Sequence, residues 1–137
     1  MFLDTNVFVY AFEFPNSNSR LIIDLLNEDR IEAIVSERVF KEVYRYFRRF
    51  YSKELADEYR VYIFSTCQIV PAHEISGKMD KYRGEIKDKD LEQLTTVREY
   101  GIKHLVSYDR DFESVKEYTT LKDFVKLMGM KPQETEY

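Results

Sequence analysis

Two short apolar segments near opposite ends of the chain each finish in a carboxylate, and this arrangement limits the folds available. Phe2 and Leu3 run directly into Asp4, and residues 104–107 lead into Asp109. Continuous apolar runs of this kind are typical of strands buried on both faces of a parallel sheet. Ligands of open α/β sheets collect beyond the carboxyl ends of such strands. We therefore expect the fold to bring Asp4 and Asp109 into one acidic pocket.

Short apolar segments alternate with helical patterns along the chain, which predicts an α/β fold with three layers: a short central parallel sheet covered by helices. Asn6 is the expected N-cap of the first helix and Ser19 that of the second, while Gly101 and Gly129 are expected to end the last two. Strands are expected at residues 1–3, 31–35, 67–70 and 104–107, and helices at residues 7–12, 20–26, 37–50, 53–65, 73–83, 89–100 and 121–128.

The segment 37–50 carries the strongest helical pattern. Phe40, Val43, Phe47 and Phe50 recur there at the spacing of a stripe that faces a core. We therefore expect these four side chains to be buried.

Length and composition favour one folded domain over residues 1–129, followed by a polar tail at residues 130–137 that we expect to be frayed. Apolar residues make up 44% of the chain and charged residues 34%, which is typical of globular proteins. No apolar run approaches the roughly 18 residues of a membrane span, and no signal peptide is visible. Cys67, the only cysteine, cannot form an internal disulfide or a cysteine-rich zinc module. We expect a cytoplasmic protein with no membrane association.

The net charge of −4 argues against a broadly basic nucleic-acid-binding surface, although it does not exclude a local one. Most of the 25 acids must be solvated, so candidates are selected by their position on the expected elements. Asp4 and Asp109 follow strands, and a structural N-cap role is the main alternative for each. Glu42 lies beside the core stripe of its helix, where a surface ion pair with Arg45 is the simpler explanation.

Three further acids lie in the second half of the chain. Asp88 and Asp90 open the helix that Gly101 ends, where acids stabilise the positive end of the helix dipole. Asp111 follows Asp109 in an expected loop, where acids are common. Each is a weak candidate alone, and their weight comes from the whole set.

The order and spacing of these residues resemble the PIN domain, a family of small metal-dependent ribonucleases that includes the VapC-type toxins. The resemblance extends from residue 1 to about residue 127. Leu91 departs from it, because the family commonly has alanine after its third acid. The stretches that carry the resemblance are Leu3-Asp4-Thr5-Asn6, Ser36 to Glu42, Asp90 with Gly101 eleven residues later, and Leu105 to Phe112.

The resemblance implies a catalytic and metal-binding set of four acids: Asp4, Glu42, Asp90 and Asp109. It implies accessory roles for Thr5, Asn6, Ser107 and Asp111, the first three through hydrogen bonds. Asp88 offers a competing third acid, and the spacing to the glycine favours Asp90.

Carboxylates without neighbouring His or Cys suit hard cations, so Mg²⁺ or Mn²⁺ is the expected cofactor. A metal-activated water would hydrolyse a phosphodiester bond without a side-chain nucleophile. Structural roles are expected for His73 and His104, since neither has an obvious catalytic partner. Four clustered acids repel one another, so a divalent ion should stabilise the fold.

Basic and aromatic residues alternate in the segment 44–51, a combination that can bind single-stranded nucleic acid. Arg45 and Arg49 flank Glu42 on the helical wheel, so they are the best candidates for binding substrate phosphate. The same aromatic residues would also suit a dimer or partner-protein interface.

We expect a Mg²⁺- or Mn²⁺-dependent endoribonuclease that hydrolyses single-stranded RNA. A VapC-type toxin fits best, since one cysteine cannot build the zinc ribbons of larger relatives, and the resemblance then implies a homodimer and a small antitoxin. The first alternative is a catalytically inactive PIN-like domain that binds RNA or protein. A receiver-type phosphoacceptor role for Asp4 lacks a partner lysine, and a nucleotide-binding role lacks a Gly-rich loop.

Overall fold

The computed structural model describes residues 1–137 and contains one five-stranded sheet in which every neighbouring pair of strands is parallel. The strand order is β3-β2-β1-β4-β5, so the first strand lies at the centre. The predicted short parallel sheet is confirmed. The strands are β1 (Phe2–Leu3), β2 (Ala33–Ser36), β3 (Cys67–Val70), β4 (Leu105–Val106) and β5 (Tyr118–Thr119).

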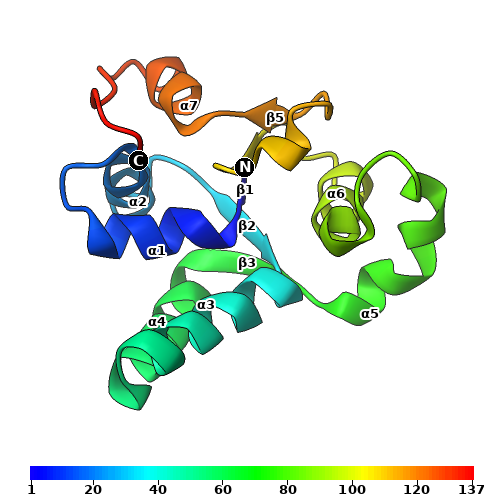
Figure 1. The fold of residues 1–137 in the computed structure, drawn as a ribbon, viewed down its shortest axis with the longest axis horizontal. Helices are drawn as coiled ribbons and strands as arrows, with labels where there is room; N and C mark the ends of the chain where they lie inside the picture. The colour runs from blue at the N-terminus through cyan, green and yellow to red at the C-terminus, as the bar shows by residue number, and fades with distance from the viewer.

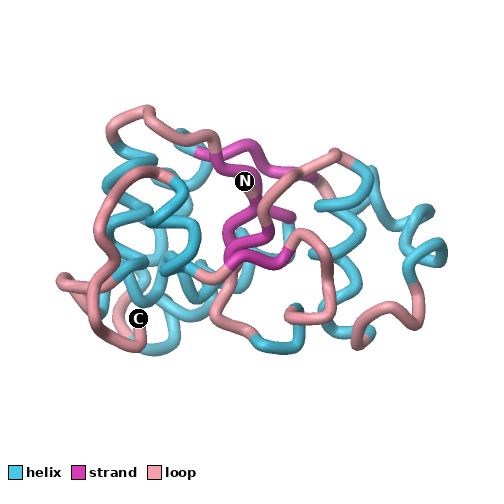
Figure 2. Tube along the Cα trace, turned by 90° about the horizontal axis from the view of Figure 1, so that it is seen from above, coloured by secondary structure: helices cyan, strands magenta, loops and turns pink.

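Helices cover both sides of this sheet, which completes the predicted three-layer α/β/α arrangement. Helices α1 and α2 lie on one side of the strands and α5 and α6 on the other (Figure 1), and the view from above shows the strands between them (Figure 2). The helices are α1 (Thr5–Glu13), α2 (Asn18–Asn27), α3 (Glu37–Phe50), α4 (Lys53–Thr66), α5 (Ala72–Ile75), α6 (Leu91–Glu99) and α7 (Leu121–Leu127). Three 3₁₀ segments are η1 (Ser76–Tyr82), η2 (Asp88–Asp90) and η3 (Arg110–Phe112).

Hydroxyl side chains fix the start of α3 and α4. Ser36 accepts a hydrogen bond from the Val39 amide, and Ser52 accepts one from the Leu55 amide. These bonds satisfy amide groups that have no partner within the helix. The predicted α3 boundaries are confirmed, and the β3 boundaries are as well.

The structure corrects the predicted helix starts. α1 begins at Thr5 with Asp4 as its N-cap, because the Asp4 carboxylate accepts the Thr5 amide; Asn6 lies inside the helix. Ser17 rather than Ser19 caps α2, since the Ser17 hydroxyl accepts the Arg20 amide.

The second half of the chain departs further from the prediction. Residues 73–83 do not form one helix, because α5 ends at Ile75 and a 3₁₀ segment follows. β5 was not expected, since two residues are too few for a recognisable periodic pattern. Its pairing with β4, from Leu105 to Tyr118, is what makes this segment a strand.

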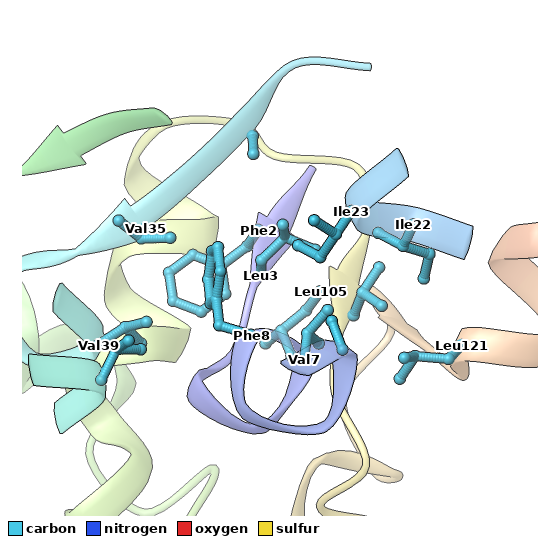
Figure 3. Close-up of a cluster of buried hydrophobic side chains, with 14 of the residues drawn as sticks. Phe2, Leu3, Val7, Phe8, Ile22, Ile23, Val35, Val39, Leu105 and Leu121 are labelled. Atoms are coloured by element: carbon cyan, nitrogen blue, oxygen red, sulfur yellow. The ribbon is translucent and has the colours of Figure 1, made fainter. Parts of the chain in front are cut away.

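The core surrounds the central strand. Phe2 and Leu3 are fully buried within a cluster of 26 buried apolar residues. Figure 3 shows side chains from β1, β2, β4, α1, α2, α3 and α7 gathered there. Because both faces of β1 are covered, the strand has no polar residue before Asp4.

The buried face of α3 consists of Val39, Val43 and Phe47, each fully buried. Phe40 is only partly buried, and Phe50 is 59% exposed, so the prediction of a buried Phe50 was wrong. Phe50 is the last residue of α3, where it packs on Tyr46 rather than into the core.

The C-terminal segment is packed rather than frayed. The Asn18 side chain donates to the Gln133 carbonyl and accepts from the Gln133 amide, at 3.2 and 2.8 Å. The Tyr137 ring stacks on Phe14, with ring centroids 4.9 Å apart. These contacts attach the tail to α1 and α2, and composition alone does not reveal them. No helix in the structure combines the length and the apolar character that crossing a bilayer requires.

We expect Phe47→Ala to lower the free energy of unfolding by about 3–5 kcal/mol, because it leaves a cavity in the place of a fully buried ring. That ring also stacks on Tyr59, at a centroid distance of 4.0 Å, and the substitution removes this stacking. Phe50→Ala, the same change at an exposed ring, should stay within about 0.5 kcal/mol of wild type. Urea denaturation of both variants measures the difference, and equal effects would contradict the assignment of the core.

Candidate metal centre

The acids selected from the sequence lie at the carboxyl edge of the sheet. Asp4 follows β1, Ser107 and Asp109 follow β4, and α3 begins directly after β2. The strand order places β2 and β4 on either side of β1. The chain therefore reverses its direction of winding beside β1, which is where open α/β sheets bind their ligands.

Asp4 is buried, with only 8% of its surface exposed, and both of its carboxylate oxygens are bonded. Oδ1 accepts the Thr5 amide at 2.9 Å and Oδ2 accepts the Ser107 hydroxyl at 2.7 Å. Burial raises the pKa of Asp4, and the bonds from Ser107 and Thr5 oppose that rise. The capping role considered for Asp4 is real, but it uses only one of the two oxygens.

Glu42 joins this arrangement through Thr5. The Thr5 hydroxyl donates to Glu42 Oε2 at 2.6 Å, and Arg38 Nε donates to Glu42 Oε1 at 2.8 Å. The ion pair considered between Glu42 and Arg45 is absent, because Arg38 occupies the carboxylate from the preceding turn. Two neighbours thus fix the orientation of the Glu42 carboxylate.

Arg38 also connects α3 to the segment before α6. Its guanidinium donates to the Lys89 carbonyl, and its main-chain amide donates to Glu92 Oε1 at 3.1 Å. None of Arg38, Lys89 and Glu92 was expected from the sequence to lie at this site. The spacing of Arg38 and Glu42, one helical turn apart, was the available signal for the first of them.

A compact group of acids lies next to Asp4. One carboxylate oxygen from each of Asp90, Asp109 and Asp111 lies within 4.8 Å of the others. Asp109 Oδ1 accepts the Asp111 amide at 2.9 Å, and the Asp109 amide donates to Ser107 Oγ at 2.9 Å. Ser107 therefore bonds both Asp4 and the backbone of Asp109, one member of this three-acid cluster.

Asp90 is the least satisfied of these acids. The residue is 5% exposed, and its Oδ2 atom is buried without a hydrogen-bond partner. Burial raises the pKa of Asp90, the nearby Lys89 ammonium opposes the rise, and the charges of Asp109 and Asp111 add to it. A buried oxygen without a donor is costly, and a bound cation would remove that cost.

Two lysines offset part of the negative charge. Lys89 Nζ lies 3.1 Å from Asp111 Oδ2 and 3.8 Å from both Asp90 Oδ2 and Asp109 Oδ2. Lys87 Nζ lies 3.2 Å from Asp111 Oδ1. The Lys89 and Lys87 ammonium groups hold the pKa of Asp111 below its usual value.

The donor set fits a hard divalent cation. All available ligands are carboxylate oxygens, which Mg²⁺ and Mn²⁺ prefer, and Asp90 Oδ2 has no hydrogen-bond partner, only the Lys89 ammonium at 3.8 Å. Of the four acids expected to bind metal, Asp90 and Asp109 belong to the three-acid cluster. Asp4 and Glu42 lie outside that group and are linked to it through Ser107 and Thr5. Asp111, expected only as an accessory, is the third member.

Asp88, the competing third acid and a possible accessory, and Asn6, an expected accessory, have no bond to the other acids. The Asp88 side chain is 78% exposed and pairs with Arg83 at 3.6 Å, away from the three-acid cluster. Asn6 is exposed and lines a cavity beside Asp109.

The expected substrate-binding arginines, Arg45 and Arg49, are both exposed on α3, and Arg49 lies over the Phe50 ring at 5.2 Å. His104 is held by Thr119 at 3.0 Å, and His73 is exposed, so neither histidine contacts the acids.

Comparison with known proteins gives one family and a set of similar folds. The family model described as the PIN domain matches residues 1–118. A chain of a toxin-antitoxin complex from Klebsiella pneumoniae superposes with a TM-score of 0.68 at 17% identity, covering 88% of this chain and 96% of that one. The Mycobacterium tuberculosis toxin VapC20, described as cleaving the sarcin-ricin loop, gives a TM-score of 0.59 at 15% identity, covering 82% and 92%. No curated protein matches the sequence significantly.

We expect Ser107→Ala to destabilise the protein by about 1–3 kcal/mol, because the buried Asp4 carboxylate loses its hydroxyl donor. The Asp109 amide loses its acceptor in the same substitution. Ser65→Ala is the matched control, since Ser65 is exposed and donates only to a carbonyl of its own helix. Urea denaturation compares the two, and a Ser107→Ala protein as stable as the control would refute this role.

We expect Mn²⁺ at about 100 times its dissociation constant to raise the melting temperature by roughly 5–10 °C. Asp90→Asn should abolish most of this rise, because it removes the buried oxygen that lacks a partner. Thermal melts with Mn²⁺ and with EDTA measure both effects. An unchanged melting temperature of the wild type would count against a metal centre.

The difference in stability between wild type and Asp90→Asn should also depend on pH. The pKa of Asp90 is raised in the folded protein, so its charged form costs stability at neutral pH. In EDTA at pH 7, Asp90→Asn should therefore be at least as stable as wild type. This loss of stability declines as the pH falls below the folded-state pKa of Asp90, and it is gone below the unfolded-state pKa. The stability advantage of Asp90→Asn should therefore shrink on acidification. An advantage that grows on acidification would contradict this sign.

Proposed function

This chain belongs to the PIN domain family, and on that premise we propose that it is a divalent-metal-dependent endoribonuclease of single-stranded RNA. One observation carries the proposal: three carboxylates lie together at the carboxyl edge of the sheet, and one of their oxygens is buried without a hydrogen-bond partner. A buried carboxylate oxygen without a donor costs stability, and a divalent ion would supply a closer contact than the Lys89 ammonium at 3.8 Å. We assign the domain to residues 1–129, with residues 130–137 as its packed tail.

The proposed ligands of Mg²⁺ or Mn²⁺ are Asp90, Asp109 and Asp111, with Asp4 and Glu42 next to them. The bound ion would supply a Lewis acid that offsets charge on the phosphoryl oxygens and lowers the pKa of water. The choice of Mg²⁺ or Mn²⁺ rests on the oxygen-only donor set.

The surrounding residues position these acids. Ser107 and Thr5 hold the two oxygens of Asp4, so that its carboxylate keeps one orientation. Arg38 and Thr5 hold Glu42 in the same way from opposite oxygens. Fixed carboxylates need little rearrangement when substrate arrives, which is the advantage of a preorganised site.

Two pairs of cations are available to bind substrate phosphate. Lys87 and Lys89 lie beside the three-acid cluster, with their side chains 66% and 54% exposed. Arg45 and Arg49 project from α3, beyond Glu42, and neither forms an ion pair with an acid of this chain. We propose that the RNA backbone approaches along this side of α3.

We further propose a toxin role, with a small antitoxin as partner and a homodimer as the assembly. The support for a partner is the similarity to a chain of a toxin-antitoxin complex, a similarity of fold. Val61 and Phe64 lie one helical turn apart on α4 with 63% and 75% exposure, so apolar surface is available for an interface. Analytical ultracentrifugation of the wild type and of Phe64→Glu tests the dimer.

We expect the purified protein to cleave a labelled single-stranded RNA with Mn²⁺ and not with EDTA. Asp4→Asn and Asp90→Asn should each lose more than the roughly 10–100-fold that removal of an outer-shell partner costs. Asp88→Asn is the matched control and should keep wild-type activity, because its carboxylate faces Arg83.

The controls decide between the alternatives. Activity lost in Asp88→Asn but kept in Asp90→Asn would reverse the assignment of the third acid. A wild type that binds Mn²⁺ and RNA without cleaving would instead identify a catalytically inactive binding domain.

A further inference from the structure

A cavity of about 540 Å³ lies next to the metal centre, on the β4–β5 side of the central strand. Ser107 and Asp109 form part of its wall, so it shares two residues with the acidic site. Residues that follow β4 and β5 line it, which places it at the same carboxyl edge of the sheet. Its volume falls in the roughly 300–1,000 Å³ range of small-ligand sites. We call it the β4–β5 cavity.

Two cations line this cavity without any ion-pair partner. Arg110 begins η3 immediately after Asp109, and Lys122 lies in the first turn of α7. Twelve other lysines and arginines of this chain pair with acids, including Lys87 and Lys89, but these two do not. An unpaired arginine and lysine in one cavity suit a phosphate group.

Aromatic rings form another part of the wall. Tyr108 packs edge-on against Tyr10 and Tyr137, with centroids 5.2 and 5.4 Å apart, and its hydroxyl bonds to Ser19 at 2.6 Å. These contacts hold the wall in place before any ligand binds. Tyr118 also lines the cavity, and no other aromatic ring packs against it. Part of this residue packs against the core, and the part that lines the cavity is where a base can contact the ring.

We propose that the β4–β5 cavity is a nucleotide subsite, in which Tyr118 stacks on a base and Arg110 and Lys122 bind the adjoining phosphate. The inference rests on the proposed function and names part of its substrate: one unstacked nucleotide of single-stranded RNA, beside the phosphate that is cleaved. Double-stranded RNA is excluded, because its paired bases do not leave the helix to enter a cavity of this kind. Glu136, the cavity's acidic side chain apart from Asp109, is suited to accept hydrogen bonds from a base rather than to contact phosphate.

The position of the cavity complements the arginines of α3. α3 follows β2, on one side of β1, whereas the cavity lies beyond β4 and β5 on the other side. An RNA strand that crosses the three-acid cluster would therefore contact Arg45 and Arg49 on one side and the β4–β5 cavity on the other.

The test is the affinity of the metal-free protein for a labelled oligouridine, measured by fluorescence anisotropy in EDTA. Arg110→Ala/Lys122→Ala should raise the dissociation constant about tenfold or more. It should also make the slope of log affinity against log salt shallower by about 0.7 for each phosphate that the protein no longer neutralises. The matched control is Lys103→Ala/Lys126→Ala, which removes two exposed charges outside the cavity and should leave both quantities unchanged. Equal weakening by the two double variants, or none by either, would overturn the subsite.

A second variant tests the base. Tyr118→Leu should weaken oligouridine binding roughly 5- to 100-fold and leave the affinity for an abasic ribose-phosphate oligomer unchanged. A loss of affinity for both probes would mean that the ring only supports the fold.

Failure of the subsite is distinguishable from failure of the nuclease assignment. If the wild type cleaves RNA and the Arg110→Ala/Lys122→Ala variant binds RNA as tightly as the wild type does, only the subsite proposal is rejected. If the wild type neither binds nor cleaves RNA, the subsite and the nuclease function are both rejected. The Mn²⁺-induced rise in melting temperature should be equal in wild type and in this double variant, and its loss would mean that the substitutions disturb the metal centre instead of a separate subsite.

Discussion

The burial of one carboxylate at the end of the central strand is the constraint on which the rest of the site depends. Asp4 sits where water is excluded, so its charge must be solvated by the protein. The Ser107 hydroxyl, directly after β4, and the Thr5 amide, at the start of α1, donate hydrogen bonds to the Asp4 carboxylate. The Thr5 hydroxyl in turn donates to Glu42 on α3. A single desolvated group thereby aligns three elements that are far apart in sequence. The same bonds that make the burial tolerable also orient the acids.

In the three-acid cluster, the negative charge is offset by ammonium groups rather than by neutral hydrogen-bond donors. Asp90, Asp109 and Asp111 are balanced by Lys87 and Lys89, which come from the segment that carries Asp90 itself. A divalent ion would compete with the Lys89 ammonium for the same oxygens, since both are cations close to the same carboxylates. The affinity of the proposed site for a metal would therefore depend on where this lysine can move. Because the Lys89 side chain is half exposed, it can turn toward solvent, or toward a phosphate of the proposed substrate.

Local sequence was sufficient for those features that depend on local physics. The fourteen residues of α3 were predicted with both boundaries, because a long amphipathic pattern has few other solutions; its cap at Ser36 was not predicted. Asp90 was selected over Asp88 by its spacing to a glycine, and the structure places only Asp90 among the clustered acids. Features that depend on remote partners could not be predicted. The two-residue β5 exists through pairing with β4, and Asp111 joins Asp90 and Asp109 because η3 lies beside the start of α6. The exposure of Phe50 likewise depends on where neighbouring elements end.

The pairing of β1 with β4 has a consequence for synthesis of the protein. β1 is made long before its hydrogen-bonded neighbour on one side, because that neighbour begins at Leu105. Contacts between residues so distant in sequence form late, because closing the long loop between them loses chain entropy before the contacts can stabilise the fold. The Ser107 hydroxyl that bonds Asp4, and the acids Asp109 and Asp111 beyond it, are made only after β1, β2 and β3. A nascent chain that has not yet reached Leu105 therefore has no partner for the Asp4 carboxylate on that side and no assembled acidic site.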